Sequence, residues 1–305
     1  MQIGLIGLGK MGGNMARRLR RAGIDVVGFN RDSDVTAALA AECGLVAAES
    51  ADALVARLES PRRVWLMLPA GDVTETYVQD LGEALDAGDI LIDGANSWYR
   101  DSMRRGAMLR NAGIEFLDAG VSGGVWGLDK GYALMVGGSD DAFEAIRPVI
   151  EALAPGADRG WVHTGPVGSG HFAKMIHNGI EYGMMQAYAE GFALLKGRDD
   201  FGLDLAAIAE SWRHGSVVRS WLLDLCADVL RDSQDLDDVA PYVADSGEGR
   251  WTALEGIEQG VPTPVMSLAL MARFASQGSA DYTSKLLAMM RRQFGGHAVK
   301  GAAER

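Results

Sequence analysis

Short apolar runs that alternate with helical patterns over the first half of the chain constrain its fold more than any other feature. The second half keeps only the helical pattern, from a long stretch at residues 171–196 to residue 294. Strands that alternate with helices at this spacing are typical of a parallel, doubly wound α/β sheet. We therefore expect an α/β domain at residues 1–164 and an all-helical domain at residues 165–305. The expected strands are residues 3–6, 25–29, 64–68, 89–93, 114–118 and 132–136.

A glycine-rich turn separates the first expected strand from the first expected helix. Residues 7–12 read Gly-Leu-Gly-Lys-Met-Gly, which fits G-x-G-x-x-G. Its glycines allow a tight turn and a close approach of the backbone to a pyrophosphate, which then faces the helix amino end. The strand before and the helix after favour a Rossmann-type dinucleotide site over an ordinary glycine-rich turn. The predicted cofactor-binding residues are Gly7, Leu8, Gly9, Lys10, Met11, Gly12, Asn30, Arg31, Asp32, Leu68 and Asn96.

The end of the second expected strand bears on the choice of nucleotide. Asn30, Arg31 and Asp32 lie where an acidic residue can bind the ribose hydroxyls or an arginine can bind a 2′-phosphate. Asp32 would repel that phosphate, whereas Arg31 could stack on adenine without selecting for phosphate. The sequence predicts NAD, with NADP less favoured; Arg31 could also be an ordinary surface arginine.

Charge and cysteine content exclude several classes of protein. The net charge of −12 argues against nucleic-acid and anionic-membrane binding but leaves room for a small anionic substrate held by local arginines. Cys43 and Cys226 cannot build a disulfide framework, which favours a reducing compartment. From the sequence we expect neither a signal peptide nor a membrane-spanning segment. A cytoplasmic protein is expected.

Two further loops follow expected strands, at the edge of the sheet where ligands bind in open α/β folds. Residues 93–97 read Asp-Gly-Ala-Asn-Ser, and residues 121–124 read Val-Ser-Gly-Gly. Bare backbone amides at Gly123 and Gly124, with the Ser122 hydroxyl, suit a carboxylate. A purely structural turn at Ser-Gly-Gly remains an equal alternative.

A polar stripe marks the long expected helix. Lys174, His177, Asn178, Glu181 and Tyr182 are spaced so that they share one face of a helix that is otherwise largely apolar. A solvated face more often pairs Lys with Glu than it carries His, Asn and Tyr. A base and an acid on one face favour a catalytic site over a structural one.

These motifs together resemble the 6-phosphogluconate dehydrogenases in their short form, over nearly the whole chain. The wider superfamily of β-hydroxyacid dehydrogenases shares the glycine turn, the Ser-Gly-Gly loop and the lysine, but usually has Asn-Asn where this chain has His177-Asn178. The motifs that carry the resemblance are residues 7–14, 93–97, 120–124, 174–182, 219–220 and 294–297.

The resemblance implies oxidative decarboxylation of 6-phosphogluconate to ribulose 5-phosphate and CO2, a step of the pentose phosphate pathway and of gluconate utilization. It implies that Lys174 takes the proton of the C3 hydroxyl while hydride leaves C3, and that Glu181 protonates C1 of the resulting enediol. It assigns the sugar acid to Asn96, Ser122, Gly123, Gly124, His177 and Asn178. It assigns the phosphate to Tyr182, Arg219, Arg291 and His297, with Arg291 and His297 coming from a neighbouring subunit of a homodimer or homotetramer.

The chain departs from the longer family members in one loop. Ser246 and Glu248 stand where those members carry a Lys-Gly-Thr phosphate-binding run, so that contact is not assigned here. No metal site is expected, because a β-keto group accepts the electrons of decarboxylation and the five histidines lack metal-ligand spacing. The tail that carries Arg291 and His297 could also be a frayed terminus.

Two other functions remain open at this point. One is a β-hydroxyacid dehydrogenase of the 3-hydroxyisobutyrate type, against which Arg219, Arg291 and His297 argue, because these cationic donors suit a phosphate. The other is a non-catalytic NAD-binding sensor, against which Lys174 and Glu181 argue.

Overall fold

A computed structural model describes residues 1–279, 281–295 and 298–299 of the 305-residue chain. The chain divides into two compact units, Met1–Ile176 and a second that begins at His177. The division falls inside one long helix, α8 (Ser169–Lys196). The domain boundary expected after residue 164 stays a prediction.

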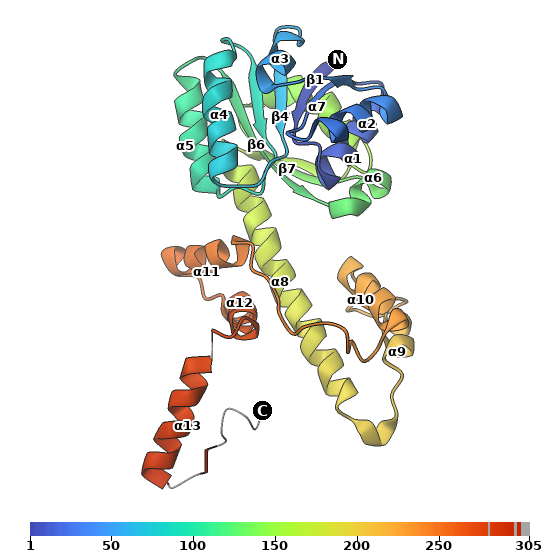
Figure 1. Ribbon diagram of the computed structural model, residues 1–305, viewed down its shortest axis with the longest axis vertical. Helices are drawn as coiled ribbons and strands as arrows, with labels where there is room; N and C mark the ends of the chain where they lie inside the picture. The colour runs from blue at the N-terminus through green and yellow to red at the C-terminus, as the bar shows by residue number, and fades with distance from the viewer. Residues whose placement is uncertain (280, 296–297, 300–305) are drawn as a thin grey trace. The chain divides into compact units, whose positions relative to one another are not determined.

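The first unit is built on one sheet, which has eight strands in the described part of the chain and the order β3-β2-β1-β4-β5-β6-β7-β8 (Figure 1). The order reverses between β1 and β4, as it does in a doubly wound fold. The predicted α/β class with a helical second half is therefore confirmed. The strands are β1 (Gln2–Ile6), β2 (Asp25–Phe29), β3 (Val46–Ala47), β4 (Arg63–Leu66), β5 (Ile90–Asp93), β6 (Glu115–Ser122), β7 (Ala133–Gly137) and β8 (Trp161–Gly165).

The sheet differs from the expected all-parallel one at a single pair. β6 and β7 are antiparallel, with Gly120 opposite Met135. Only residues 123–132 join them, fewer than a parallel crossover needs, so the chain turns back on itself. β7 and β8 are parallel again because a full helix, α7 (Asp140–Leu153), joins them. β3 and β8 were not among the expected strands.

Helices cover both faces of the sheet (Figure 1). Leu19, Leu39 and Phe143 bring α1, α2 and α7 into the apolar core on one face. Leu54 and Leu109 belong to the core on the other face, with α3, α4 and α5. Both strand surfaces are buried, which explains why these strands are continuous apolar runs. The helices not yet bounded are α1 (Lys10–Arg21), α2 (Ser33–Cys43), α3 (Ala51–Ala56), α4 (Asp72–Ala84), α5 (Tyr99–Arg110), the 3₁₀ helix η1 (Gly124–Trp126) and α6 (Gly127–Lys130).

The described residues of the second unit form helices joined by loops and contain no strand. Phe192 of α8 packs with Leu205 and Leu223 in one small core, and Tyr182 packs with Leu270 in another. No helix in the described residues combines the length and the apolar character needed to cross a membrane. The elements after α8 are the 3₁₀ helix η2 (Asp199–Phe201), α9 (Leu205–Trp212), α10 (Trp221–Asp232), α11 (Glu248–Gln259), α12 (Pro264–Ser276) and α13 (Asp281–Gly295).

Candidate active site

The glycine turn between β1 and α1 has the geometry of a dinucleotide-binding loop. Gly7 has φ +92°, and a Cβ there would lie 2.3 Å from the carbonyl oxygen of Met67. A Cβ at Gly12 would lie 1.9 Å from the Gly7 carbonyl oxygen, so only glycine lets α1 pack this closely on the turn. A Cβ at Gly9 would meet nothing within 4 Å. The turn is therefore closed at Gly7 and Gly12 and open at Gly9, where a pyrophosphate can approach the backbone.

The turn lies at the point where the strand order of the sheet reverses. β1 pairs with β2 on one side and with β4 on the other, so the loops after these strands meet there. The Leu8 amide donates a hydrogen bond of 3.0 Å to Oδ1 of Asn30, which links the loops after β1 and β2. Leu68, after β4, would contact a Cβ at Gly7 at 3.0 Å. Leu8, Asn30 and Leu68, one from each of these three loops, thus lie near the glycine turn, at the position where doubly wound folds bind dinucleotides.

Asp32 is also the N-cap residue of α2, a structural role that was not predicted from the sequence. Its carboxylate accepts a 3.0 Å hydrogen bond from the Asp34 amide and caps the amino end of α2. Its side chain remains exposed, as does that of Arg31 beside it. The cap holds the Asp32 carboxylate in a fixed position shortly after the end of β2.

A buried ion pair supports the loop that carries Asn96. Asp93, at the end of β5, accepts hydrogen bonds from the Ala95 amide (3.0 Å) and from Oγ of Ser97 (2.9 Å). Nη1 of Arg105 lies 2.9 Å from Oδ2 of Asp93, and the two residues are 1% and 0% exposed. Hydrogen bonds to the buried Asp93 carboxylate therefore hold Ala95 and Ser97 in place, while Asn96 between them is exposed.

Arg105 also links this loop to α4. Its Nε donates a 2.8 Å hydrogen bond to Oε2 of Glu75, and Arg104 donates two bonds of 2.7 Å to the same carboxylate. These hydrogen bonds, first from Arg104 and then from Arg105, lower the pKa of Glu75 to about 2. Glu75 therefore stays ionised at every physiological pH and completes the charge balance around Arg105.

The loop after β6 is the second predicted substrate loop. Ser122 is the last residue of the strand, and Gly123 and Gly124 follow with φ +139° and +52°. A Cβ at Gly123 would lie 3.1 Å from the ring of Tyr132, which is fully buried beneath the loop. Because β5 and β6 are neighbours and pair Asp93 with Asp118, the Asn96 loop and the Ser122 loop leave the same edge of the sheet.

Lys174 lies on α8 and is 6% exposed. A Cβ at Gly120 would lie 2.4 Å from Cβ of Lys174, so the bare backbone of β6 makes room for the lysine stem. Gly120 precedes Ser122 by two residues on the same strand. The structure thus brings the predicted base next to the strand that carries the predicted substrate loop.

The other predicted residues of the polar stripe belong to the second unit and lie on the same helix. Nδ1 of His177 lies 3.0 Å from Oδ1 of Asn178 and 3.9 Å from Oε2 of Glu181. These contacts join an amide, an imidazole and a carboxylate along the helix. Together, Asn178 and His177 can donate hydrogen bonds to a polyhydroxy ligand, and Glu181 provides a carboxyl group.

Tyr182 is the centre of a cluster that the sequence reading only partly found. Its hydroxyl lies 3.5 Å from Oδ1 of Asp245 and 3.4 Å from Oγ of Ser246. The guanidinium of Arg273, on α12, lies 3.4 Å from the centre of the Tyr182 ring. Hydrogen bonds from Arg250 and from the Gly247 amide lower the pKa of Asp245 against the opposing effect of burial. Arg273 was missed because no spacing in the sequence relates it to residue 182.

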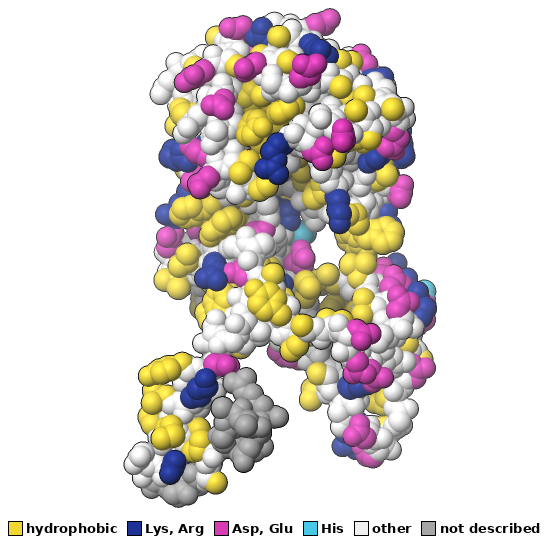
Figure 2. All heavy atoms as spheres, viewed as in Figure 1, with side chains coloured by type: hydrophobic (Ala, Val, Ile, Leu, Met, Phe, Trp, Pro, Cys, Tyr) yellow, Lys and Arg dark blue, Asp and Glu magenta, His cyan; other side chains and the backbone are white. Residues whose placement is uncertain are grey.

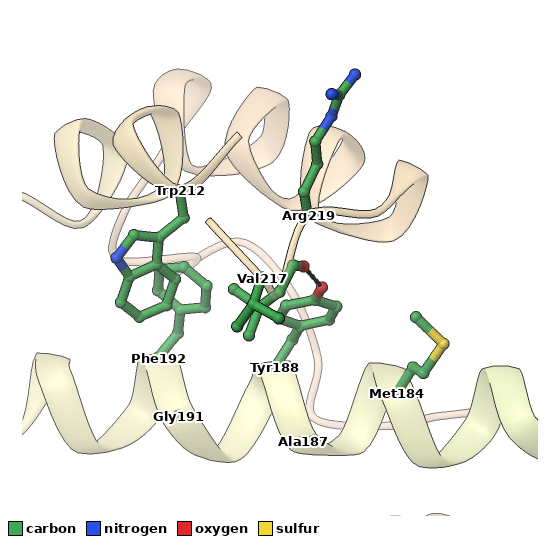
Figure 3. Close-up of a pocket in the computed structure, with 9 residues that line it drawn as sticks. Met184, Ala187, Tyr188, Gly191, Phe192, Trp212, Val217 and Arg219 are labelled. Atoms are coloured by element: carbon green, nitrogen blue, oxygen red, sulfur yellow. Dashed lines mark hydrogen bonds between the residues drawn. The ribbon is translucent and has the colours of Figure 1, made fainter. Parts of the chain in front are cut away.

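Arg219 lies in a different part of the second unit, at an apolar pocket of about 390 Å³. Figure 3 shows the Arg219 side chain extended away from the ring of Tyr188. Arg291 lies on α13, within the stretch expected to be helical up to residue 294, and its side chain is exposed. His297 lies outside the described residues.

Across the residues that the structure describes, no group of three His, Cys, Asp or Glu side chains could hold a metal ion.

A glycine turn at the switch point of a doubly wound sheet, with a buried lysine beside the neighbouring loops, defines a dinucleotide-dependent dehydrogenase. Residues 2–165 match the NAD binding domain of 6-phosphogluconate dehydrogenase, and residues 170–300 match the C-terminal domain of that enzyme. The chain belongs to the 6-phosphogluconate dehydrogenase family, which confirms the resemblance seen in the sequence.

Proteins similar to this chain include 6-phosphogluconate dehydrogenases and a 3-hydroxyisobutyrate dehydrogenase. An NAD(+)-dependent, decarboxylating 6-phosphogluconate dehydrogenase of Haloferax volcanii is 44% identical over 301 residues, which is 98% of each chain. The 6-phosphogluconate dehydrogenase of Plasmodium falciparum superposes with a TM-score of 0.84 at 29% identity, over all of this chain and 67% of that one. A 3-hydroxyisobutyrate dehydrogenase of Mycobacterium tuberculosis gives 0.71 at 27% identity, over 92% and 94%.

Proposed function

We propose that the protein oxidises and decarboxylates 6-phosphogluconate to ribulose 5-phosphate and CO2 with NAD as the hydride acceptor. The observation that carries this is the buried Lys174, seated against β6 beside the Ser122 loop, on a helix that continues with His177, Asn178 and Glu181. The Haloferax volcanii enzyme, named for this activity, is similar over nearly its full length. A 3-hydroxyisobutyrate-type activity and a non-catalytic NAD sensor remain the alternatives.

The residues present fit a dinucleotide. The open side at Gly9 and the amino end of α1 would hold the pyrophosphate, and the exposed carboxylate of Asp32 would face the adenosine ribose. Asp32 favours NAD because it opposes the charge of a 2′-phosphate. When bound, NAD supplies the chemistry of hydride acceptance.

Two residues of α8 carry the proton transfers in this proposal. Lys174 takes the proton of the C3 hydroxyl as C3 is oxidised; the resulting 3-keto acid then loses its carboxylate as CO2. Lys174 returns its proton to the keto oxygen, and Glu181 protonates C1 of the enediol. Asn96, Ser122, Gly123, Gly124, His177 and Asn178 hold the sugar acid.

Several side chains with hydrogen-bond donors are candidates to bind the substrate phosphate. Tyr182, Arg219, Arg291 and His297 are carried over from the sequence comparison with the family. To these we add Arg273, because its guanidinium lies on the Tyr182 ring and planar guanidinium groups suit phosphate oxygens. Substituting Arg219 or Arg273 by Met, one at a time, and measuring KM for 6-phosphogluconate distinguishes the two.

A comparison of substrates tests the proposed function. Purified protein is assayed for NADH formation with 6-phosphogluconate, gluconate and 3-hydroxyisobutyrate at equal concentrations. We expect 6-phosphogluconate to be favoured at least 100-fold in kcat/KM, because only it satisfies the phosphate donors. A preference for 3-hydroxyisobutyrate would favour the first alternative, and NAD binding without turnover of any sugar acid would favour the sensor.

We also propose a cytoplasmic homodimer or homotetramer whose helical domain, residues 165–305, binds substrate and joins subunits. Large apolar side chains on α13 support this, since Leu286, Leu287, Met289 and Met290 are each more than 40% exposed. Figure 2 shows apolar side chains gathered over this helix. Isolated surface leucines are common, but a cluster of this kind marks an interaction site.

Subunit mixing tests whether sites are shared. Lys174→Met and Arg291→Ala variants, each inactive alone, are mixed under conditions that exchange subunits. If Arg291 acts in the partner's site, some mixed oligomers hold one site with both residues intact, and activity partly returns. Verified exchange without any recovery contradicts the shared site.

A further inference from the structure

We propose that Asp118 is a positioning residue: its buried carboxylate fixes the amino end of α8 and thereby places the amine of Lys174 for proton transfer. This inference rests on the proposed function. Neither the family motifs nor the polar stripe of α8 include Asp118. The residues that carry it all lie within the first unit.

Asp118 is fully buried near the middle of β6 and accepts two short hydrogen bonds. Its Oδ1 accepts from the Gly168 amide at 2.6 Å, and its Oδ2 accepts from the His171 amide at 2.7 Å. Gly168 immediately precedes α8 and His171 lies in its first turn, where the amide groups have no partner within the helix. A carboxylate at this end also interacts favourably with the helix dipole, so one side chain holds the end of the helix both by geometry and by charge.

Three glycines allow α8 to pack closely against β6 and β7. A Cβ at Gly170 would lie 2.4 Å from the Asp118 carbonyl oxygen, and one at Gly137 would lie 2.6 Å from Oδ1 of Asp118. A Cβ at Gly120 would meet Cβ of Lys174 at 2.4 Å. Because Asp118 and Gly120 are two residues apart on one strand, they share one face of the sheet. Residues 118–120 of β6 therefore set both the anchor of the helix and the contact of Lys174.

A second contact joins the first turn of α8 to α5. Oγ of Ser102 lies 2.7 Å from Nδ1 of His171, and both side chains are buried. His171 precedes Lys174 by three residues, so it lies one helical turn away on the same side. Ser102 lies on the helix that follows the Asn96 loop and carries Arg105. The Ser102–His171 bond thus fixes α8 relative to one substrate loop, while Asp118 fixes it relative to the other.

The chemistry that this arrangement serves is sensitive to position. A base that removes a hydroxyl proton must lie within hydrogen-bond distance of it, and a shift of about 1 Å can lower a rate on the order of 100-fold. Asn in place of Asp118 keeps the side-chain shape but exchanges one acceptor oxygen for an amide NH2 group, a donor that would face the backbone N–H of Gly168 or of His171. That end of the helix must then shift, and Lys174 shifts with it.

The test measures kcat per NAD-binding site in Asp118→Asn, with sites counted by NAD titration of the full-length protein. We expect kcat per site to fall about 10- to 100-fold, with the affinity for NAD within twofold of wild type and KM for 6-phosphogluconate within threefold. A merely structural role would lower the number of sites and the rate in proportion. Asp204→Asn is the matched control, because Asp204 accepts a bond from the Ala207 amide at the amino end of α9; it should retain the wild-type kcat.

Ser102→Ala and Ser102→Thr extend the test to the second contact. The alanine variant should lose kcat per site at least fivefold, and the threonine variant, which keeps the hydroxyl, should recover most of it. Wild-type kcat per site in both Asp118→Asn and Ser102→Ala would overturn the proposal, as would an Asp118→Asn that does not fold while Ser102→Ala keeps full activity. If the wild type itself fails to turn over 6-phosphogluconate, the proposed function fails, which is a separate outcome.

Discussion

The ion pair beneath the Asn96 loop yields a quantitative prediction for Arg105→Met. The substitution leaves the Asp93 carboxylate fully buried with its bonds from Ala95 and Ser97 but without a counter-charge. Removing one partner of such a pair costs about 3–5 kcal/mol of unfolding free energy. For a unit of this size, that lowers the melting temperature by roughly 6–20 °C.

A matched set of variants separates burial from charge. Arg147→Met removes an arginine from the exposed pair with Glu144 and should change stability by no more than about 0.5 kcal/mol. The double variant Asp93→Asn with Arg105→Met has no unpaired buried charge, so it should cost less than the sum of the two single variants by about 2 kcal/mol. Urea and thermal unfolding followed by circular dichroism supply the values. If Arg105→Met costs no more than Arg147→Met, or if the two single costs add, the reasoning is refuted.

Four further predictions concern stability and cofactor choice. The hydroxyl of Tyr132 is buried with no hydrogen-bond partner, so Tyr132→Phe should raise the unfolding free energy by about 1 kcal/mol in urea titrations; a loss would indicate a hidden partner. Burial raises the pKa of Tyr132 to about 12, so its neutral form contributes stability that is complete below pH 10 and is lost between pH 10 and 12; this loss should vanish in the phenylalanine variant. The pKa of Glu75 is lowered to about 2, so its contribution is complete above about pH 4.5 and is lost as the pH falls towards 2; acid unfolding of Glu75→Gln should lack this component. Asp32→Ser should shift the ratio of kcat/KM values at least about fivefold towards NADP, since it removes roughly 1 kcal/mol of like-charge repulsion; a wild type that prefers NADP would contradict this.

Local patterns in the sequence predict the parts of the site that form near one another along the chain. The glycine turn at Gly7–Gly12 and the long helix that carries Lys174 need only a few consecutive residues, and the structure has both. The relation of the Asn96 and Ser122 loops follows from strand order alone. These features depend on interactions between residues close in sequence or on the order of the strands, so the spacing of residues along the chain predicts them.

The missed features depend on contacts between distant segments. Asp118 binds residues 50 and 53 positions later, Arg105 reaches Glu75 30 positions earlier, and Arg273 packs on Tyr182. A buried Asp in an apolar strand gave no indication of its partners. The two-residue strand β3 is too short for a periodic pattern. The reversal at β7 follows from the short connection at residues 123–132, and periodicity within single elements does not indicate strand direction.

The measurement that tests the central claim most directly follows CO2 and NADH together. Wild-type protein is given NAD and 6-phosphogluconate labelled with ¹³C at the C1 carboxylate, and Lys174→Met is the control. We predict one labelled CO2 for each NADH formed by the wild type and neither product from the variant, although the variant still binds NAD. NADH without CO2, or a Lys174→Met variant with near wild-type turnover, would contradict the account.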